Sequence, residues 1–246
     1  MQTTEVFGVS LPLSVACFLF QFVTYHITCG FFAIVDYYKL LPNYKLHNSD
    51  HKTYSQLLPR VVFNQVVFYL PSFILLQYLG IAFCSFEPKL SVWLFVADYL
   101  FYSFLQEIIF YSGHRFLLHS KWGFQLLGHE LHHTTKGSVA VSQHYMAPID
   151  YLIEIVITNM LPFFFMKKTN IYFELFVISL NTVTGPWDHS GYKYPVGESS
   201  FAHSMHHLRS SCSFGGSAAF TDWILKTAYY FYGYTNLPKI KESSNH

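Results

Sequence analysis

Hydrophobic residues along this chain form long runs separated by short polar segments. The five longest runs cover residues 9–34, 61–83, 90–111, 147–166 and 171–186. A helix needs about 20 mostly apolar residues to cross about 30 Å of hydrocarbon. The first three runs therefore predict membrane-spanning helices. The last two are shorter and are separated by a few polar residues, so they predict a helical hairpin that either crosses the bilayer or only enters it.

The composition supports the same class of protein. Hydrophobic residues make up 52% of the 246 residues and charged residues only 12%, whereas soluble proteins contain about 25% charged residues. We therefore expect an all-α integral membrane protein with four to five membrane-embedded helices. No repeat or flexible linker interrupts the sequence, which predicts a single membrane domain over 1–246. The first run has no basic segment before it, so it is expected to be a retained span rather than a cleaved signal peptide.

Charge predicts both the partners and the orientation. The net charge is +1 and Lys and Arg are not clustered, which argues against a nucleic-acid partner. Cytoplasmic loops of membrane proteins collect Lys and Arg, and twelve of these residues lie in 36–60, 112–146 and 188–246. We therefore expect these segments on the cytoplasmic face, with 112–146 and 188–246 forming a helical cap. The three remaining residues, on the other side, are Lys89, Lys167 and Lys168.

Histidines provide the clearest chemical signal. Ten of the 14 histidines lie between residues 114 and 207, and the pattern His-x-x-His-His occurs twice, about seventy residues apart. On a helix, residues three and four positions apart share a face, so each triplet can present its imidazoles to one metal centre. Both triplets fall in the expected cap, which predicts a metal site there. The triplets are His129, His132 and His133, and His203, His206 and His207.

Two further histidines stand at the end of the third run. His114 and His119 are five residues apart, which corresponds to about 140° around a regular helix. Either the helix ends or distorts between them, or the two serve different metals. His189, just after the last run, would emerge on the same face of the membrane.

The number of histidines favours two metal ions. Imidazole binds Fe, Zn, Cu and Ni, and eight or nine histidines exceed the four ligands of one tetrahedral zinc. Oxygen activation needs a redox metal with open positions, which makes two irons the natural interpretation. No catalytic residue beyond the metal ligands is expected, but carboxylates commonly orient such ligands. The acidic residues predicted to do so are Glu107, Glu130 and Asp188.

At these residues the chain resembles the membrane fatty acid hydroxylase and sterol desaturase superfamily, over about 94–228. Three histidine boxes carry the resemblance, together with His189-Ser-Gly-Tyr, which is similar to an element of the sterol-acting members. The first box is one residue longer than usual, and Tyr145-Met-Ala-Pro lacks a histidine that relatives often carry, so His144 is counted as its replacement. The resemblance implies these metal ligands: His114, His119, His129, His132, His133, His144, His189, His203, His206 and His207.

The resemblance is nearest to the C-4 methylsterol oxidases and the related fatty-acid-hydroxylase-domain proteins. It implies an O2-dependent, non-haem di-iron monooxygenase that oxidises a sterol in sterol biosynthesis. It also implies a multi-pass protein of the endoplasmic reticulum membrane, with the metal site on the cytoplasmic face. Electrons from NAD(P)H would arrive through cytochrome b5 and its reductase.

Other functions remain open at this point. With the same metal site, the substrate could be a fatty acyl chain, a sphingolipid or a sterol side chain, as in a cholesterol 25-hydroxylase, and the reaction could be a desaturation. Outside the enzymes, the histidines could serve a metal-binding membrane transporter or sensor. Transporters place their ligands near the middle of the bilayer along a path, whereas these histidines are expected at one face.

Overall fold

The structure is a computed structural model that describes residues 2–87, 91–166, 169–195, 197–216 and 219–237. Several residues used in the sequence predictions lie outside the described residues. They are Leu90, where the third run begins, and the charged residues Lys89, Lys167, Lys168, Lys239 and Lys241.

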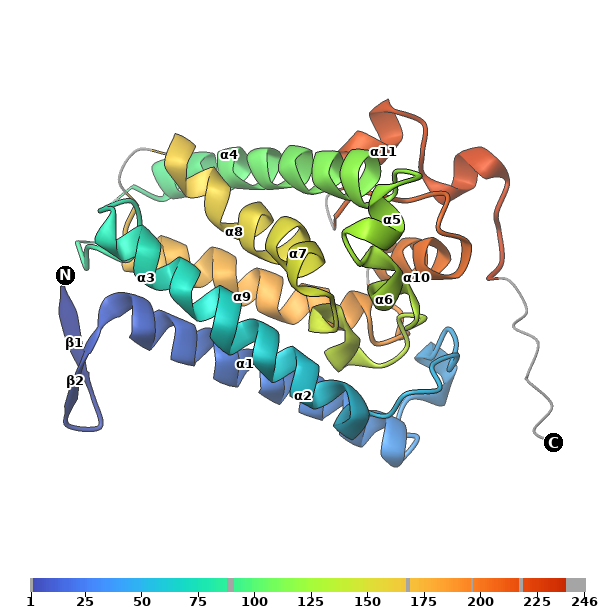
Figure 1. Ribbon diagram of the computed structural model, residues 1–246, viewed down its shortest axis with the longest axis horizontal. Helices are drawn as coiled ribbons and strands as arrows, with labels where there is room; N and C mark the ends of the chain where they lie inside the picture. The colour runs from blue at the N-terminus through green and yellow to red at the C-terminus, as the bar shows by residue number, and fades with distance from the viewer. Residues whose placement is uncertain (1, 88–90, 167–168, 196, 217–218, 238–246) are drawn as a thin grey trace.

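Long helices run side by side and form the body of the molecule (Figure 1). Four helical segments are long and apolar enough to cross a membrane: Leu13–Tyr37, Tyr54–Tyr78, Val92–Leu118 and Pro148–Phe165. The fifth hydrophobic run forms α9 (Ile171–Asp188), which packs against α1. The structure confirms the prediction of a mostly helical protein with four to five such helices. The elements are α1 (Leu13–Tyr37), α2 (Tyr54–Asn64), α3 (Leu70–Tyr78), α4 (Val92–Tyr111), α7 (Pro148–Tyr151) and α8 (Thr158–Met160).

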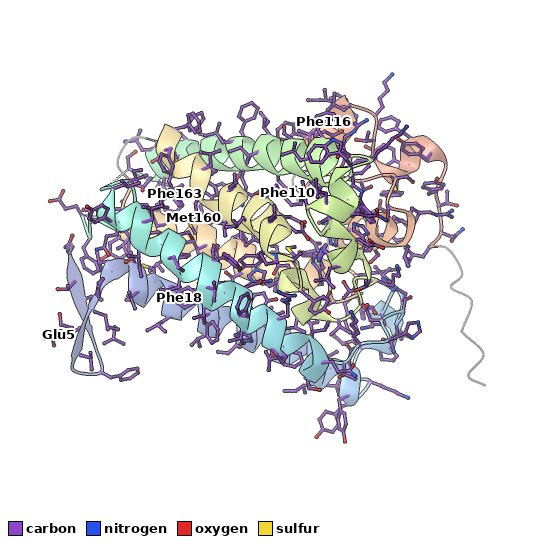
Figure 2. The ribbon with its side chains drawn as sticks, in the orientation of Figure 1. Glu5, Phe18, Phe110, Phe116, Met160 and Phe163 are labelled. Atoms are coloured by element: carbon purple, nitrogen blue, oxygen red, sulfur yellow. The ribbon has the colours of Figure 1, made fainter. Side chains whose placement is uncertain are left out.

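Aromatic and sulfur-containing side chains fill the space between these helices. Figure 2 shows Phe18, Met160 and Phe163 between the helices, and all three belong to one buried cluster. Large apolar side chains are also exposed along the outer surface, and α4 is the least buried of the four candidate spans. An exposed apolar belt of this kind is the surface that a bilayer would cover.

The chain begins with a small β-hairpin that the all-α prediction missed. Strands β1 (Thr3–Val6) and β2 (Val9–Pro12) pair in antiparallel register, with Thr3 opposite Pro12. The turn residues Phe7 and Gly8 both have positive φ, as a tight two-residue hairpin turn requires. Because proline is tolerated at a helix start but not in a helix interior, α1 begins just after Pro12 rather than at residue 9.

The second span starts earlier than the hydrophobic pattern indicates. Helix α2 begins at Tyr54, seven residues before the expected start, because Thr53 and Gln56 form a capping box. A π-helical turn (Gln65–Tyr69) then joins α2 to α3. The polar side chains of this first turn conceal the helix from a reading that follows hydrophobicity alone.

Short helices gather at one end of the body, as predicted for the cap (Figure 1). Segments from 112–146 and from 188–237 meet there, and the buried histidines lie between them. These elements are a π-helical turn (Ser112–Leu118), α5 (Gly123–Leu126), α6 (His129–His133), a 3-10 turn (Ala140–His144), α10 (Ser199–Arg209), α11 (Phe220–Ile224) and a 3-10 turn (Tyr229–Tyr232).

One lysine ties the cap to the end of α1. The Nζ atom of Lys45 lies 2.6 Å from Asp36 Oδ1 and donates to the carbonyl oxygens of Ser138 at 3.1 Å and Ser190 at 2.8 Å. Its charge also sits over the ring of Tyr192, 4.3 Å from the centroid. The residue that follows His189 is thus held against the loop after α6.

Candidate metal centre

Nine histidine side chains converge in the cap and form two groups. In each group the nearest ring nitrogens all lie within 4.8 Å of one another. Seven of the nine are buried, and the other two are partly buried. Group one contains His114, His119, His129, His133 and His206, and group two contains His132, His189, His203 and His207.

The two His-x-x-His-His triplets are shared between the groups, which corrects the expectation that each triplet serves one centre. Helix α6 gives its first and last histidines, four residues apart, to group one and the middle one, His132, to group two. Helix α10 does the reverse, because His203 and His207 belong to group two and His206 to group one. Each helix therefore offers a pair from successive turns to one group and a single imidazole to the other.

The spacing of His114 and His119 is explained by a π-helical turn. The backbone N–H of His119 donates to the carbonyl of His114 at 2.9 Å, a bond that spans five residues instead of four. A π-helical turn is wider than an α-helical turn and brings residues five apart closer to one face, so both side chains belong to group one. Of the alternatives that the sequence left open, the distorted helix is the one observed.

Backbone carbonyls fix the protonation of five imidazoles. In each of these the Nδ1 atom lies 2.8–3.3 Å from a carbonyl oxygen, which can only accept a hydrogen bond. The proton must therefore be on Nδ1, and Nε2 carries a bare lone pair directed into the group. The pairs are His114 with Phe214, His132 with Tyr145, His189 with Gly185, His206 with Cys212 and His207 with Thr135.

In the five imidazoles held by carbonyls, the inward-facing Nε2 atom carries no proton. The Nε2 atoms of His132 and His189 lie 3.3 Å apart, although both rings carry their proton on Nδ1. Nε2 of His114 is buried and has no hydrogen-bond partner among the described residues. Facing lone pairs repel each other, and a buried polar atom without a partner is costly. A cation in each group removes both costs, so the residues present fit metal ions.

Two buried acidic side chains lie beside His129 and His132. Asp150 Oδ1 lies 2.9 Å from Nδ1 of His129, and Glu154 approaches the same nitrogen at 3.4 Å and His132 at 3.9 Å. Both acids are buried on the helical run that begins at Pro148. The sequence analysis missed them, although two acids four residues apart in an apolar run are a signal, because a charge there costs about 2.5–3.5 kcal/mol unless it has a partner.

Two of the acidic residues that the sequence suggested form hydrogen bonds beside the histidine groups. Glu107 accepts hydrogen bonds from the N–H of Gly216, at 2.9 Å, and from the hydroxyl of Thr221, so it fastens the loop whose Phe214 carbonyl holds His114. Asp188 accepts from Ser199 Oγ at 2.9 Å and links the end of α9 to the start of α10.

The position of Glu130 does not support its predicted role in orienting a metal-binding histidine. Its side chain is exposed, whereas the three histidines on the same helix are buried. Among the described residues it forms no hydrogen bond or ion pair with a histidine.

His144 lies outside both groups, which corrects its inclusion as a tenth ligand. Its Nδ1 atom contacts Gln65 Nε2 at 3.1 Å and Tyr151 Oη at 3.3 Å. Its ring stacks on Tyr25, with centroids 4.3 Å apart. Because the 3-10 turn that carries His144 packs against α2, this imidazole is used to hold the cap to the body.

Burial keeps the imidazoles neutral. It holds the pKa values of His132, His133 and His207 well below the usual value near 6.5, and the neighbouring histidines lower them further. For His189, burial lowers the pKa to about 4, against the opposing effect of its bond to Gly185. Neutral imidazole is the form that binds a metal, so the site is ready for one at neutral pH.

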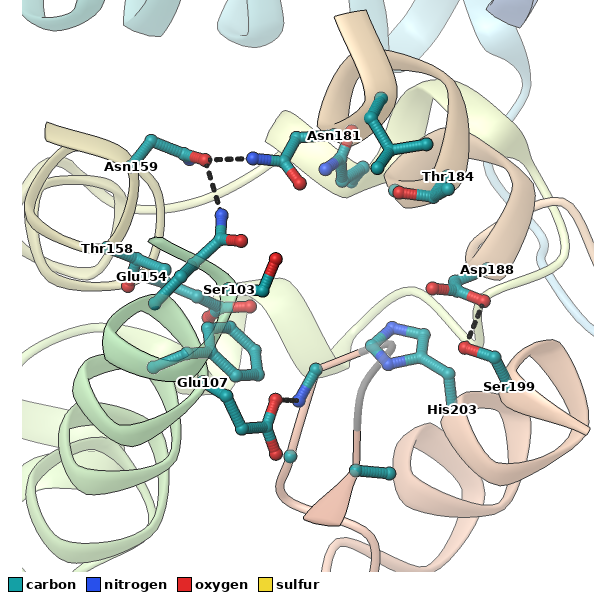
Figure 3. Close-up of a pocket in the computed structure, with 18 of the residues that line it drawn as sticks. Ser103, Glu107, Glu154, Thr158, Asn159, Asn181, Thr184, Asp188, Ser199 and His203 are labelled. Atoms are coloured by element: carbon teal, nitrogen blue, oxygen red, sulfur yellow. Dashed lines mark hydrogen bonds between the residues drawn. The ribbon is translucent and has the colours of Figure 1, made fainter. Parts of the chain in front are cut away.

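A cavity of about 400 Å³ reaches group two from the body of the protein (Figure 3). His189 and His203 form part of its wall, next to Glu154 and Asp188. The remaining wall comes from α4, α8, α9 and the loop before α11. A site of 300–1,000 Å³ is typical for small-molecule ligands, so the cavity has room for a small molecule in contact with one of the two groups.

Comparison with known proteins identifies one family model, which matches the region containing the histidines, and several relatives. The fatty acid hydroxylase model matches residues 99–227, just over half of the chain, and this region contains all nine histidines. A methylsterol monooxygenase of Arabidopsis thaliana is 27% identical over 161 residues, which cover 61% of this chain and 58% of that protein. A very-long-chain aldehyde decarbonylase of Oryza sativa subsp. indica is 27% identical over 143 residues, with 54% and 52% covered.

A further relative is fatty acid hydroxylase domain-containing protein 2 of Macaca fascicularis, 26% identical over 129 residues, with 49% of this chain and 35% of that protein covered. The matches therefore span between about a third and three fifths of the length of these relatives. No solved structure matches the chain.

Proposed function

Because the chain belongs to the fatty acid hydroxylase family, we propose that it is a di-iron oxygenase that oxidises a methyl group at C-4 of a sterol. The observation that carries the proposal is the division of nine inward-facing imidazoles into two groups. We expect one metal ion in each group, and histidine is a good ligand for iron. Bound there, the irons would supply the reduction of O2 and the insertion of oxygen into an unactivated C–H bond.

The protein's own residues prepare this chemistry. Backbone carbonyls and Asp150 hold the imidazoles with their Nε2 atoms inward, so little reorganisation is needed when a metal binds. The carboxyl groups of Asp150 and Glu154 are buried beside His129, and in their ionised forms they would offset part of the positive charge that two metal ions would bring into the site. Group two borders the cavity, and we place the reacting carbon of the substrate on that side.

The sterol assignment draws support from the methylsterol monooxygenase among the relatives and from a cavity large enough for part of a rigid lipid. The aldehyde decarbonylase is equally similar, so the substrate has to be identified by its product. We further propose that the protein resides in the endoplasmic reticulum membrane with its cap in the cytoplasm. Cytochrome b5 and its reductase would pass electrons from NAD(P)H to that face.

The proposal is tested in yeast that lacks its C-4 methylsterol oxidase. Sterols and fatty acids are profiled by mass spectrometry in cells expressing the chain, the double variant His206→Ala/His207→Ala, or the variant Glu130→Gln. We expect the accumulated 4,4-dimethylsterols to disappear with the intact chain and with Glu130→Gln, and to persist with the double variant. Persistent dimethylsterols together with a new oxidised lipid would overturn the sterol assignment and keep the oxygenase. No change in any lipid, from a well-expressed and iron-loaded protein, would overturn both.

A further inference from the structure

Three amide side chains meet at one wall of the cavity. Gln106 of α4 and Asn181 of α9 each donate from their amide nitrogen to the same oxygen, Oδ1 of Asn159, at 2.9 Å (Figure 3). Asn159 in turn donates from Nδ2 to the carbonyl of Ile155 at 2.8 Å. We refer to Gln106, Asn159 and Asn181 as the amide cluster.

The orientation of all three amides follows from one backbone carbonyl. The oxygen of Ile155 can only accept a hydrogen bond, so Asn159 must turn its nitrogen towards it and its oxygen away. That oxygen accepts from two neighbours, so Gln106 and Asn181 must both present their nitrogens. Their carbonyl oxygens are consequently directed away from Asn159, and Figure 3 shows the oxygen of Asn181 on the cavity side.

A third acceptor stands beside the amide cluster. The hydroxyl of Thr158 donates to the carbonyl of Ile153 at 3.2 Å, which leaves only its lone pairs for another group. Thr158 and the three amides all line the cavity. This part of the wall thus offers the lone pairs of three side-chain oxygens, and one hydrogen of each amide group is already used in these hydrogen bonds.

The amide cluster and the histidines face each other across the cavity. Figure 3 shows Asn159 and Asn181 on one side and His203 on the other, and His189 and His203 belong to group two. A ligand that fills the space is therefore in contact with polar acceptors at one place and with the proposed oxidising site at another. The cavity wall also contains apolar residues, among them Ile155, Val177 and Leu180.

We propose that the amide cluster binds a hydroxyl group of the substrate and so selects lipid alcohols over the corresponding ketones. This proposal rests on the proposed function, because it takes the cavity as the substrate site. A hydroxyl can donate to the carbonyl oxygens of Gln106 and Asn181. A ketone can accept from the remaining amide hydrogens, but it cannot donate and leaves these oxygens unpaired. A site built to bind a hydroxyl rejects an analogue that cannot make the bond, since its own polar groups are then left unpaired.

A purely structural role would have a different signature. The amide cluster also joins α4, α8 and α9, and hydrogen bonds between helices hold membrane proteins together. If that were its only role, replacing Asn181 would weaken the binding of every ligand to a similar extent. Selection of a hydroxyl instead predicts a change in the ratio between two ligands that differ only at that group.

The test measures this ratio in the purified, iron-loaded full-length protein in lipid nanodiscs. Binding of a 4,4-dimethylsterol and of the corresponding 3-ketosterol is compared for the wild type, Asn181→Leu and Gln106→Met, with Gln125→Met as a matched control at an exposed position outside the cavity. We expect the wild type and the control to bind the alcohol about tenfold more tightly than the ketone. Both cluster variants should bring the ratio close to one while keeping the affinity for the ketone.

The same samples are assayed for oxidation, which separates the two proposals. If the wild type prefers the alcohol, the cluster variants lose that preference and no sterol is oxidised, the selection stands and the sterol oxidase assignment falls. If the sterol is oxidised but alcohol and ketone bind alike in the wild type, the selection falls and the oxidase assignment stands. Equal losses for both ligands in Asn181→Leu, or no binding of either by the wild type, also overturn the selection.

Discussion

At the scale of single residues, the site depends on where each imidazole keeps its proton. Five of the nine histidines donate a hydrogen bond from Nδ1–H to a backbone carbonyl. A sixth, His129, has its Nδ1 atom beside the carboxylate of Asp150. A carbonyl is present whatever the side chain of its residue. Asp150 is different, because its role is lost when the side chain changes.

The variant Asp150→Asn is expected to weaken metal binding by about tenfold, because the orienting partner keeps its shape and loses its charge. The measurement is the metal retained by purified protein during competition with a chelator. Glu130→Gln removes the same charge from the exposed side of α6 and is the control, with no expected change. Equal retention in both variants would contradict the role given to Asp150.

The position of His144 leads to a second prediction. His144→Gln should retain the full metal content, because the imidazole contacts Gln65, Tyr151 and Tyr25 rather than either group. It should lower the melting temperature instead, since these buried contacts are lost. His203→Gln, which removes one of four imidazoles from group two, is expected to lose metal. The two variants are compared by metal analysis and thermal melting, and metal loss in His144→Gln would restore it as a ligand.

Site residues could be predicted from the sequence where they follow a recognisable spacing. The repeated His-x-x-His-His spacing singled out six of the nine clustered histidines, and three more followed from their place at the ends of apolar runs. Asp150 and Glu154 lie four residues apart in an apolar run, but this spacing does not connect them to His129, which they contact only through the fold. The same holds for the amide cluster, whose members lie on three different helices.

At the scale of elements, the π-helical turn at 112–118 is the part most closely tied to the site. Its wider turn, closed by a hydrogen bond over five residues, allows His114 and His119 to face the same group despite their spacing. A π-helical turn is usually equivalent to one extra residue in a regular helix. A regular helix with one residue fewer between the two histidines would therefore also place their side chains on one face.

Deleting Phe116, an exposed residue of this turn, should give a regular helix with the two histidines four residues apart. We expect the deletion variant to keep its metal, because positions four apart also share a helix face. Inserting one alanine after Phe116 should rotate His119 by about 100° and lose metal from group one. Metal content and circular dichroism are measured together. Equal metal content in the two variants would show that the turn does not set the position of His119.

Hydrophobic runs located the helices better than they located the ends. The run at 61–83 and the helix at Tyr54–Tyr78 overlap, but the capping box at Thr53 moved the start and Gly80 follows the end. The hairpin at Thr3–Val6 and Val9–Pro12 was hidden because its second strand is apolar and adjoins α1. Local capping and turn geometry decided both cases, and neither is visible in average hydrophobicity.

At the scale of the whole molecule, gathering neutral imidazoles makes stability depend on pH. In the unfolded chain a histidine takes up a proton near pH 6.5. In the folded, metal-free protein burial lowers these pKa values, to about 4 for His189 and well below 6.5 for His132 and His207. Below pH 6.5 the unfolded chain therefore binds more protons than the folded one, and stability falls as the pH falls.

We expect the melting temperature of the metal-free protein to drop between pH 6.5 and about pH 4, with about 1.4 kcal/mol of unfolding free energy lost per pH unit for each such histidine. Thermal melting in detergent across this range measures the slope. The variant His133→Gln/His207→Gln should have a shallower slope, since two of the groups are gone. An unchanged slope would mean that other residues dominate the response.

The histidine groups also constrain when the centre can be assembled in the cell. All four candidate spans end by Phe165, whereas three of the nine imidazoles come from α10, and the carbonyl that holds His114 follows it by 100 residues. During synthesis the helices before residue 166 leave the ribosome and enter the membrane before α10 exists. A nascent chain that stops short of Ser199 has two imidazoles in group two. Binding of a metal to group two is therefore expected to be a late step in biogenesis, after the four candidate spans have been synthesised.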